Sequence, residues 1–413
     1  MGSDQTMTTA PHLVLSMDTG IDDALALAYL VAAGARIDGV SATYGNVLQQ
    51  QAERNTRMLL DMLGRPDIPV AAGARHPSWA KYFVADAGCA RFHGNDGLGD
   101  LQTAGAEGPA QSPAPATAPG CVEASTGSGI VELTAARIEA LARQGHTVSV
   151  GGYPVGDPHC ALPAMPGFFA HTGIAAPELP KHPDGDCPPV TEGARMIVDA
   201  AREYGHDLTI VATGPLTDVD TALRADPDAV SRARIVFMGG TLTQEGNCYD
   251  LVCETNVLQD PQAADRVLRA HADTTMVGLD VTHRCLFGDA DVAQWTAAAT
   301  AGSCRIASLL AGIAGFSIRA NRESDPIFAA GMPLHDPLAA AVAIDPGLVS
   351  TLDLPMIVET RTGDGSGVRG RMIGNPRGVV DNAPPVHVAL GVDGDGFVRR
   401  FTDTIRGFLA SIG

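Results

Sequence analysis

The sequence predicts an α/β protein with an open, mainly parallel central sheet and helices on both faces. Short runs rich in β-branched residues alternate with helical patterns along most of the chain, which is typical of strand–helix–strand units. The runs are largely apolar and end in glycine or a polar turn, as strands buried on both faces do. Of the 413 residues, 45% are hydrophobic but only 5% are aromatic, so alanine, glycine and valine fill much of the core. Such small side chains let helices lie close against a sheet.

The alternation is clearest near the N-terminus. We expect strands at 12–18, 35–45 and 68–73, with helices at 21–34 and 49–63 between them. Further strands are expected at 207–214, 233–240 and 273–281, each beside a helical segment. In sheets of this kind ligands bind at the carboxyl ends of the strands.

The regular pattern breaks between about 100 and 190. Proline-, alanine- and glycine-rich tracts flank a helical pattern at 130–145 and a strand-like run at 146–152. We interpret this segment as an insertion of unknown role in a single domain that spans 12–413. Residues 1–11 are expected to be a disordered N-terminus.

The insertion contains histidines and cysteines that raise the question of a metal site. They are His159, Cys160, His171, His182 and Cys187. Their spacing fits no zinc pattern, so we interpret them as unliganded loop residues.

Charge and cysteine content exclude several classes of protein. The formal net charge of −19 would repel nucleic acid over most of the surface, whereas a neutral small substrate or a cation is easier to accommodate. The eight cysteines form no C-x-x-C pair, which favours free thiols in a reducing compartment. No signal peptide and no apolar stretch of roughly 18 residues is present, so we expect a cytoplasmic protein without a membrane span.

Three carboxylates follow the first predicted strand, in the stretch SMDTGIDDALA (16–26). Asp18 ends the strand, Gly20 permits a tight turn, and Asp22 and Asp23 open the next helix. Acids at a helix start often cap it and complement its dipole, which accounts for one of the two. A third carboxylate before the turn is not explained in this way, because three like charges repel unless a cation lies among them. Ligands that are all oxygens favour a hard cation, Ca²⁺ or Mg²⁺, over zinc.

A second predicted helix start has the same character. The segment PLHDPLAAA (333–341) places Asp336 in the first helical turn, next to His335. A His–Asp pair alone is more often structural than catalytic, but together with the first cluster it favours a site. His335 could protonate a leaving group or cap a neighbouring segment.

Two other strand ends carry polar groups. ATGPLTD (212–218) ends a strand in a Gly–Pro turn, which leaves the carbonyl of Thr213 free to coordinate a cation. The next strand end and the loop after it supply Met238, Asn247, Glu254 and Asn256. Amides and acids beside a bound cation can hold a polyhydroxylated ring, although each is also compatible with ordinary turn chemistry.

Together these motifs resemble the nucleoside hydrolase family, of the inosine–uridine-preferring type. The matching segments follow the family's order: DTGIDDALALA, TYGN, IPVAAGA, HGNDGLG, ATGPLTD, FMGG, EGN, CETNVLQDPQAA, LDVTH, LHDPLAAA and GVRGRMI. The resemblance covers roughly 12–100 and 191–410.

The resemblance implies the family's open α/β fold and a site for one Ca²⁺ ion. The implied ligands are Asp18, Asp23, Asp336 and the backbone carbonyl of Thr213, and Asp18 would also be the general base for a calcium-bound water. The implied sugar-binding residues are Asp22, Asn46, Met238, Asn247, Glu254 and Asn256. His335 is the candidate acid for the departing base, and His93 is expected in a mobile loop over that base. Family members are usually homodimers or homotetramers, so a homo-oligomer is expected.

The implied reaction is hydrolysis of the N-glycosidic bond of a ribonucleoside to ribose and free base, as in purine and pyrimidine salvage. Its transition state carries positive charge on the sugar, which nearby carboxylates stabilise. A cation lowers the pKa of the attacking water and binds the vicinal diol, and a histidine is suited to proton donation near neutral pH. Two alternatives remain: a non-catalytic nucleoside or sugar sensor on the same scaffold, and a metal-dependent phosphohydrolase with Asp18 as nucleophile. The second alternative needs another aspartate two residues on, where this chain has Gly20.

Three residues depart from the family pattern. Ser16 stands where an aspartate is common, Thr19 replaces the usual proline, and Thr255 replaces a common phenylalanine. The stretch before His335 has no tyrosine and carries Arg319 and Arg322 instead. These residues therefore do not indicate whether purine or pyrimidine nucleosides are preferred.

Overall fold

The computed structural model describes residues 10–101, 130–132, 144–155, 173–175, 190–248, 251–361, 368–379 and 383–413. Most of the predicted N-terminal tail and all the histidines and cysteines singled out in the insertion lie outside the described residues.

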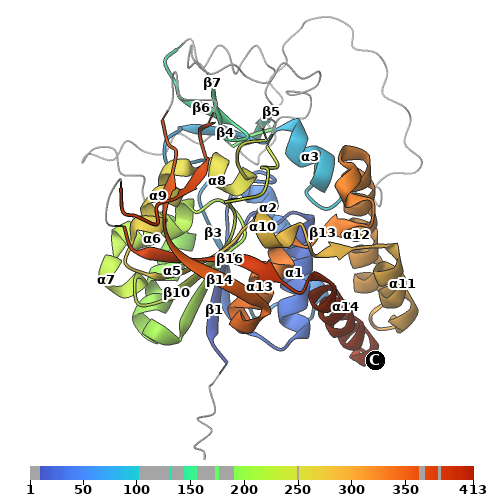
Figure 1. The fold of residues 1–413 in the computed structure, drawn as a ribbon. Coiled ribbons are helices and arrows are strands. Elements are labelled where there is room, and N and C mark those ends of the chain that lie inside the picture. The colour runs from blue at the N-terminus through green and yellow to red at the C-terminus, as the bar shows by residue number, and fades with distance from the viewer. Residues whose placement is uncertain are drawn as a thin grey trace, which may run out of the picture.

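Nine strands form one open sheet in the order β15-β14-β16-β11-β10-β9-β1-β2-β3 (Figure 1). From β16 to β3 all neighbours pair in parallel, while β14 is antiparallel to both β16 and β15. The strands are β1 (His12–Met17), β2 (Arg36–Ala42), β3 (Val70–Ala72), β9 (Leu208–Ala212), β10 (Arg234–Met238), β11 (Asp273–Val277), β14 (Val349–Val358), β15 (Met372–Gly374) and β16 (Pro385–Val392). The prediction of an open, mainly parallel sheet is confirmed.

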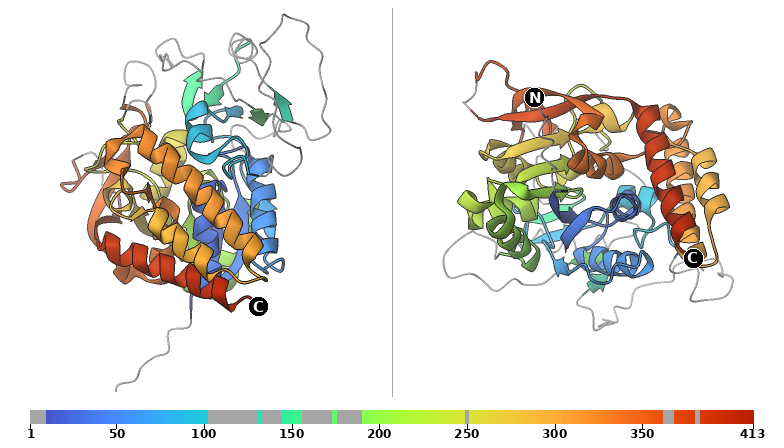
Figure 2. Two further views of the ribbon diagram at one scale, coloured as in Figure 1. Left: turned by 90° about the vertical axis from the view of Figure 1, so that its right-hand side faces the viewer. Right: turned by 90° about the horizontal axis from the view of Figure 1, so that it is seen from below.

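Helices cover both faces of this sheet because successive strand residues point to opposite sides. Leu13 and Leu15 of β1 belong to one buried cluster, and Val14 between them belongs to the other. The first cluster packs under α1 (Ile21–Ala32), α2 (Gln49–Met62), α11 (Asp289–Ala298), α12 (Cys304–Ser324), α13 (His335–Ile344) and α14 (Gly394–Ser411). The second packs under α5 (Glu192–Tyr204), α6 (Thr217–Ala225), α7 (Pro227–Val230) and α9 (Pro261–Arg269). In Figure 2, α11, α12 and α14 lie side by side at one edge of the molecule.

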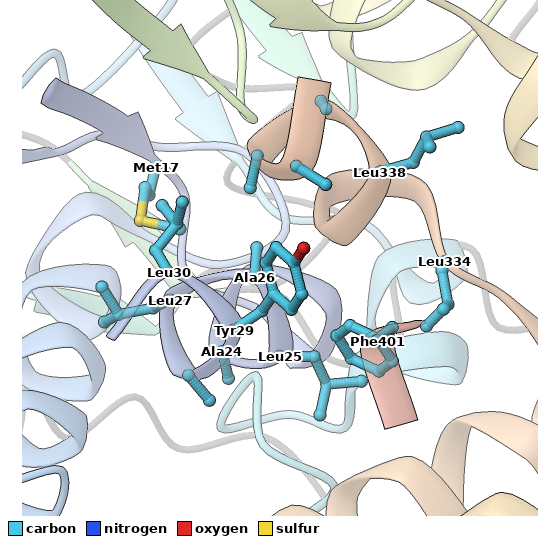
Figure 3. Packing of buried hydrophobic residues seen from close by; sticks show 14 of the residues in the cluster. Met17, Ala24, Leu25, Ala26, Leu27, Tyr29, Leu30, Leu334, Leu338 and Phe401 are labelled. Carbon is cyan, nitrogen blue, oxygen red and sulfur yellow. The ribbon is translucent and has the colours of Figure 1, made fainter. Parts of the chain in front are cut away.

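The contact between α1 and α13 positions the site. Ile21 to Leu30 of α1 are all buried, so this helix is apolar on every side and lies inside the protein. Figure 3 shows Tyr29 and Leu25 of this helix beside Phe401 of α14, and α1 is also in contact with α13, the helix that carries Leu338. Because these two helices are in contact, the acids at their first turns are brought near each other.

A smaller sheet lies beyond the carboxyl ends of the main strands, at the top of Figure 1. Its order is β5-β8-β4-β6-β7, and its strands are β4 (Tyr82–Val84), β5 (Ile130–Glu132), β6 (Val148–Val150), β7 (Tyr153–Val155) and β8 (Gly173–Ala175). The strand predicted within 146–152 is confirmed as β6. The helix predicted from 130 is wrong at its start, because the β-branched pair Ile130-Val131 forms β5 and pairs antiparallel with β8.

The other described elements are short: α3 (Ala87–His93), α8 (Thr255–Gln259), α10 (Leu279–Thr282), and the two-stranded ribbon of β12 (Leu286–Phe287) and β13 (Met332–Pro333). The five cysteines in the described part of the chain are free thiols. No helix among the described residues is both long and apolar enough to cross a membrane.

Candidate active site

Asp18 directly follows β1 and is fully buried. Its Oδ2 accepts the backbone N–H of Asn46 at 2.5 Å, while its Oδ1 has no hydrogen-bond partner among the described residues. The chain passes so close to this carboxylate at Gly45 (φ +156°) that a Cβ there would lie 2.0 Å from Oδ2. A glycine is required at that position.

Asp22 and Asp23 open α1, as predicted, but they are held differently. Asp23 Oδ2 accepts the N–H of Gly20 at 2.9 Å and Asp23 Oδ1 accepts the hydroxyl of Thr213 at 2.6 Å. The capping role considered for one of these acids therefore belongs to Asp23. Asp22 Oδ1 is buried and without a hydrogen bond in the part of the chain that the structure describes.

Asp336 at the first turn of α13 completes the cluster. Asp22, Asp23 and Asp336 each offer an oxygen within 4.8 Å of the others, and Asp336 Oδ2 is buried without a hydrogen bond to any described residue. Burial raises the pKa of Asp22 and of Asp23 to about 6, and repulsion from Asp22 adds to the effect on Asp23. Burial, followed by the neighbouring carboxylates, raises the pKa of Asp18 and of Asp336 well above the ordinary value. A cation among these oxygens would reverse that effect, and the oxygen-only donor set fits a hard divalent ion.

The cluster lies beside a cavity of about 590 Å³, a size typical of small-molecule sites. The predicted residues that line it are Asp22, Asn46, His93, Thr213, Met238, Asn247, Glu254, Asn256, His335 and Asp336. Asp18 and Asp23 lie one layer behind this wall, hydrogen-bonded to Asn46 and Thr213 respectively. The structure thus gathers all the predicted site residues at the carboxyl ends of β1, β2, β9 and β10.

Three of the wall residues are linked by the Asn256 side chain. Its Nδ2 donates to the carbonyl of Thr213 at 2.8 Å and to the carbonyl of Met238 at 3.1 Å. Because carbonyls only accept, this fixes the orientation of the amide and leaves Oδ1 as the atom available to a ligand. The Thr213 carbonyl keeps a second lone pair for a cation.

The chain matches the description "Inosine-uridine preferring nucleoside hydrolase" over residues 13–399. It belongs to this family. The protein is therefore a nucleoside hydrolase, an enzyme class that cleaves the N-glycosidic bond between sugar and base.

Relatives of this nucleoside hydrolase are similar over nearly their whole length. A pyrimidine-specific ribonucleoside hydrolase, RihA, of Salmonella gallinarum is 27% identical over 396 residues, which are 95% of this chain and 98% of the relative. A purine-preferring ribonucleoside hydrolase from Gardnerella vaginalis has a solved structure with a TM-score of 0.66 and 30% identity, covering 97% of this chain and 99% of that one. A plant nucleoside hydrolase, PpNRh1, shares the fold with a TM-score of 0.65 and 22% identity, covering 98% and 100%.

Glu254 and Asn247 of this nucleoside hydrolase are fixed by their own loop. Glu254 caps α8 by accepting the N–H groups of Asn256 and Val257, and it also accepts that of Gly240 at 2.9 Å. Asn247 Oδ1 accepts both the N–H and the hydroxyl of Thr255 at 3.0 Å, which leaves its Nδ2 to face a ligand. The threonine that departs from the family pattern at 255 therefore orients Asn247.

The two predicted histidines have different surroundings. His93 is the last residue of α3, whereas we expected it in a loop. Its Nδ1 accepts the N–H of Ile21 at 3.1 Å and lies 3.7 Å from Asp22 Oδ1. His335 Nδ1 lies 2.8 Å from the hydroxyl of Thr282. Burial, and then the charges of His283 and His93, lower the pKa of His335 well below its usual range, so its imidazole is neutral near pH 7.

The cavity also includes residues that the sequence did not single out. Ser317 and Asn321 of α12 line it, whereas Arg319 and Arg322 on the same helix are exposed. Helical periodicity could have indicated these two residues. Positions 317 and 321 continue the buried face of α12 that includes Leu310 and Ile313. Asp86 and Tyr153 come from around the smaller sheet, so part of the insertion forms cavity wall.

The other two departures are buried behind the site. The Thr19 hydroxyl is hydrogen-bonded to that of Thr56 at 2.7 Å. The Ser16 hydroxyl is fully buried without a partner in the described part of the chain, two residues before Asp18.

Proposed function

We propose that this protein hydrolyses ribonucleosides to ribose and free base, with one Ca²⁺ ion as cofactor. The observation that carries the proposal is a cluster of buried carboxylates beside a cavity of nucleoside size. Asp22, Asp23 and Asp336 offer oxygens within 4.8 Å of one another, and the buried Asp18 is near enough to raise the pKa of Asp336. We assign Asp18, Asp23, Asp336 and the Thr213 carbonyl as ligands. The partnerless oxygens of Asp18 and Asp336 support this assignment, since buried carboxylate oxygens without donors are costly unless a cation satisfies them.

A bound ion would supply positive charge that keeps these acids ionised, and it would act as a Lewis acid toward water and sugar hydroxyls. Asp18 then accepts the proton of the attacking water. Asp22 and Asn256 Oδ1 accept hydrogen bonds from the ribose 2′ and 3′ hydroxyls, Asn247 and Glu254 bind the 5′ hydroxyl, and Met238 packs against the ring. Asn46 holds Asp18 in place through its backbone N–H.

In the part of the site that would hold the departing base, His335 is a neutral imidazole before the reaction. If Thr282 donates its hydroxyl hydrogen to Nδ1, the remaining nitrogen, Nε2, carries the ring hydrogen and can donate a hydrogen bond to the departing base. His93, anchored on the first turn of α1, completes the wall near Asp22. The homo-oligomer and the cytoplasmic location expected from the sequence belong to this proposal as well.

A panel of nucleosides tests the proposal. The names of the relatives point both to pyrimidines and to purines, so uridine, cytidine, inosine, adenosine and guanosine should all be assayed with Ca²⁺ present. We expect ribose release from at least one of them and much slower release from its 2′-deoxy counterpart, which lacks a hydroxyl that Asp22 and the cation would hold.

No release above background from any ribonucleoside would contradict the proposal. If the same nucleosides nevertheless raised the melting temperature, the protein would be a sensor on the hydrolase scaffold.

A further inference from the structure

We propose that His283 is a second residue that assists departure of the base, acting beside His335; this inference rests on the proposed function. His283 directly follows α10 and lines the cavity. Its ring centroid lies 5.6 Å from that of His335, with the two planes inclined by 59°. Two imidazoles therefore face the same part of the cavity.

Only one nitrogen of His283 is available to a ligand. Nδ1 is buried and has no hydrogen-bond partner among the described residues, so Nε2 is the remaining polar atom of this cavity-lining ring. Burial lowers the pKa of His283 to about 4, which leaves the imidazole neutral near pH 7. A hydrogen-bond acceptor on the ligand would favour the tautomer with its hydrogen on Nε2. A hydrogen on Nδ1 would make no hydrogen bond there, so the change of tautomer breaks none.

The ring is also held in place. Phe328 contacts it edge to face, with centroids 5.1 Å apart and planes inclined by 82°. The preceding residue, Thr282, is the one bonded to His335 Nδ1 at 2.8 Å. The two adjacent residues Thr282 and His283 thus contribute to both imidazoles. The Thr282 hydroxyl orients the ring of His335, and His283 supplies the second ring.

The chemistry needs donors at this place. As the C1′–N bond breaks, its electron pair moves to the base, and one water supplies the oxygen and hydrogen that join C1′. The second hydrogen of that water goes to Asp18 as a proton, and the departing base takes up one proton from solvent, so the net change is addition of water across the C1′–N bond. The neutral imidazoles keep their hydrogens and act as hydrogen-bond donors. While negative charge develops on the base, N–H donors from His283 and His335 stabilise it, and a hydrogen bond to a charged group typically contributes about 10–100-fold in rate.

The test compares His283→Phe, which keeps a ring against Phe328 but has no donor, with His283→Gln, which restores an N–H. Both are assayed on the best natural ribonucleoside and on nitrophenyl riboside, whose leaving group needs no assistance. We expect kcat/KM of His283→Phe to fall about 10–100-fold on the nucleoside and to change less than about threefold on the nitrophenyl substrate, with partial recovery in His283→Gln. His271→Phe, on the exposed surface, is the control.

Equal losses on both substrates, or no loss on the nucleoside, would overturn the inference, since a purely structural role does not distinguish leaving groups. His335→Phe, which likewise removes the donor, should show the same substrate dependence as His283→Phe. A wild-type protein that releases ribose from neither substrate overturns the proposed function and this inference with it. An active wild type with an unchanged His283→Phe variant overturns only the inference.

Discussion

Asp18→Asn is expected to lower kcat for ribonucleoside hydrolysis by at least about 10²–10⁴-fold, the usual contribution of a general base. Asparagine has the size of aspartate and can still accept the N–H of Asn46, so the turn around Gly45 should persist. It cannot take a proton from water, and it removes one negative charge from the cation site. Initial rates of ribose release, with circular dichroism to confirm the fold, measure the effect.

A suitable control is Asp228→Asn, which makes the same chemical change at an exposed position of α7 far from the cavity lining. It should keep wild-type activity. If Asp18→Asn were as active as this control, Asp18 would not be the base.

Asp336→Asn should separate stability from cation binding. Burial, then the charges of Asp22, Asp23 and Asp18, raise the folded-state pKa of Asp336. The folded protein therefore binds more protons than the unfolded chain above pH ~4, and without metal the wild type loses stability as pH rises through this window. Asparagine has no such charge, and its amide can donate to Asp22. In EDTA at pH 7.5 the variant should melt higher than wild type, by an amount that shrinks toward pH 4.

In excess Ca²⁺ the order should reverse, because the wild type gains the binding free energy and the variant has lost a ligand. Thermal melts at pH 4.5, 6 and 7.5, each in EDTA and in Ca²⁺, compare the variant with wild type under six conditions. A variant that is less stable than wild type in EDTA at pH 7.5, or that calcium still stabilises fully, would contradict the assigned role of Asp336.

Much of this site could be predicted because its parts follow local rules. Apolar strands ending in polar turns placed Asp18, Thr213 and Met238 at one edge of a parallel sheet. Acids at two helix starts gave Asp22, Asp23 and Asp336, and only the packing of α1 against α13 was needed to join them.

The remainder depended on tertiary contacts that no local pattern specifies. In the smaller sheet, β4 pairs with strands from the insertion, and Tyr153 of this sheet lies in the cavity wall. The same sheet includes residues 130–132 as a strand, although their sequence begins a helical pattern. The neutral state of His335 follows from its burial beside His283, which sequence spacing does not reveal.

The proposed activity requires one divalent ion bound by Asp18, Asp23 and Asp336. Its most direct test is to strip the protein with EDTA, remove the chelator, and measure ribose release as Ca²⁺ is added back. We predict no release without added ion and full recovery near one equivalent per chain once the site is saturated. Unchanged activity in the stripped protein, with no divalent metal detectable in the sample, would contradict the claim.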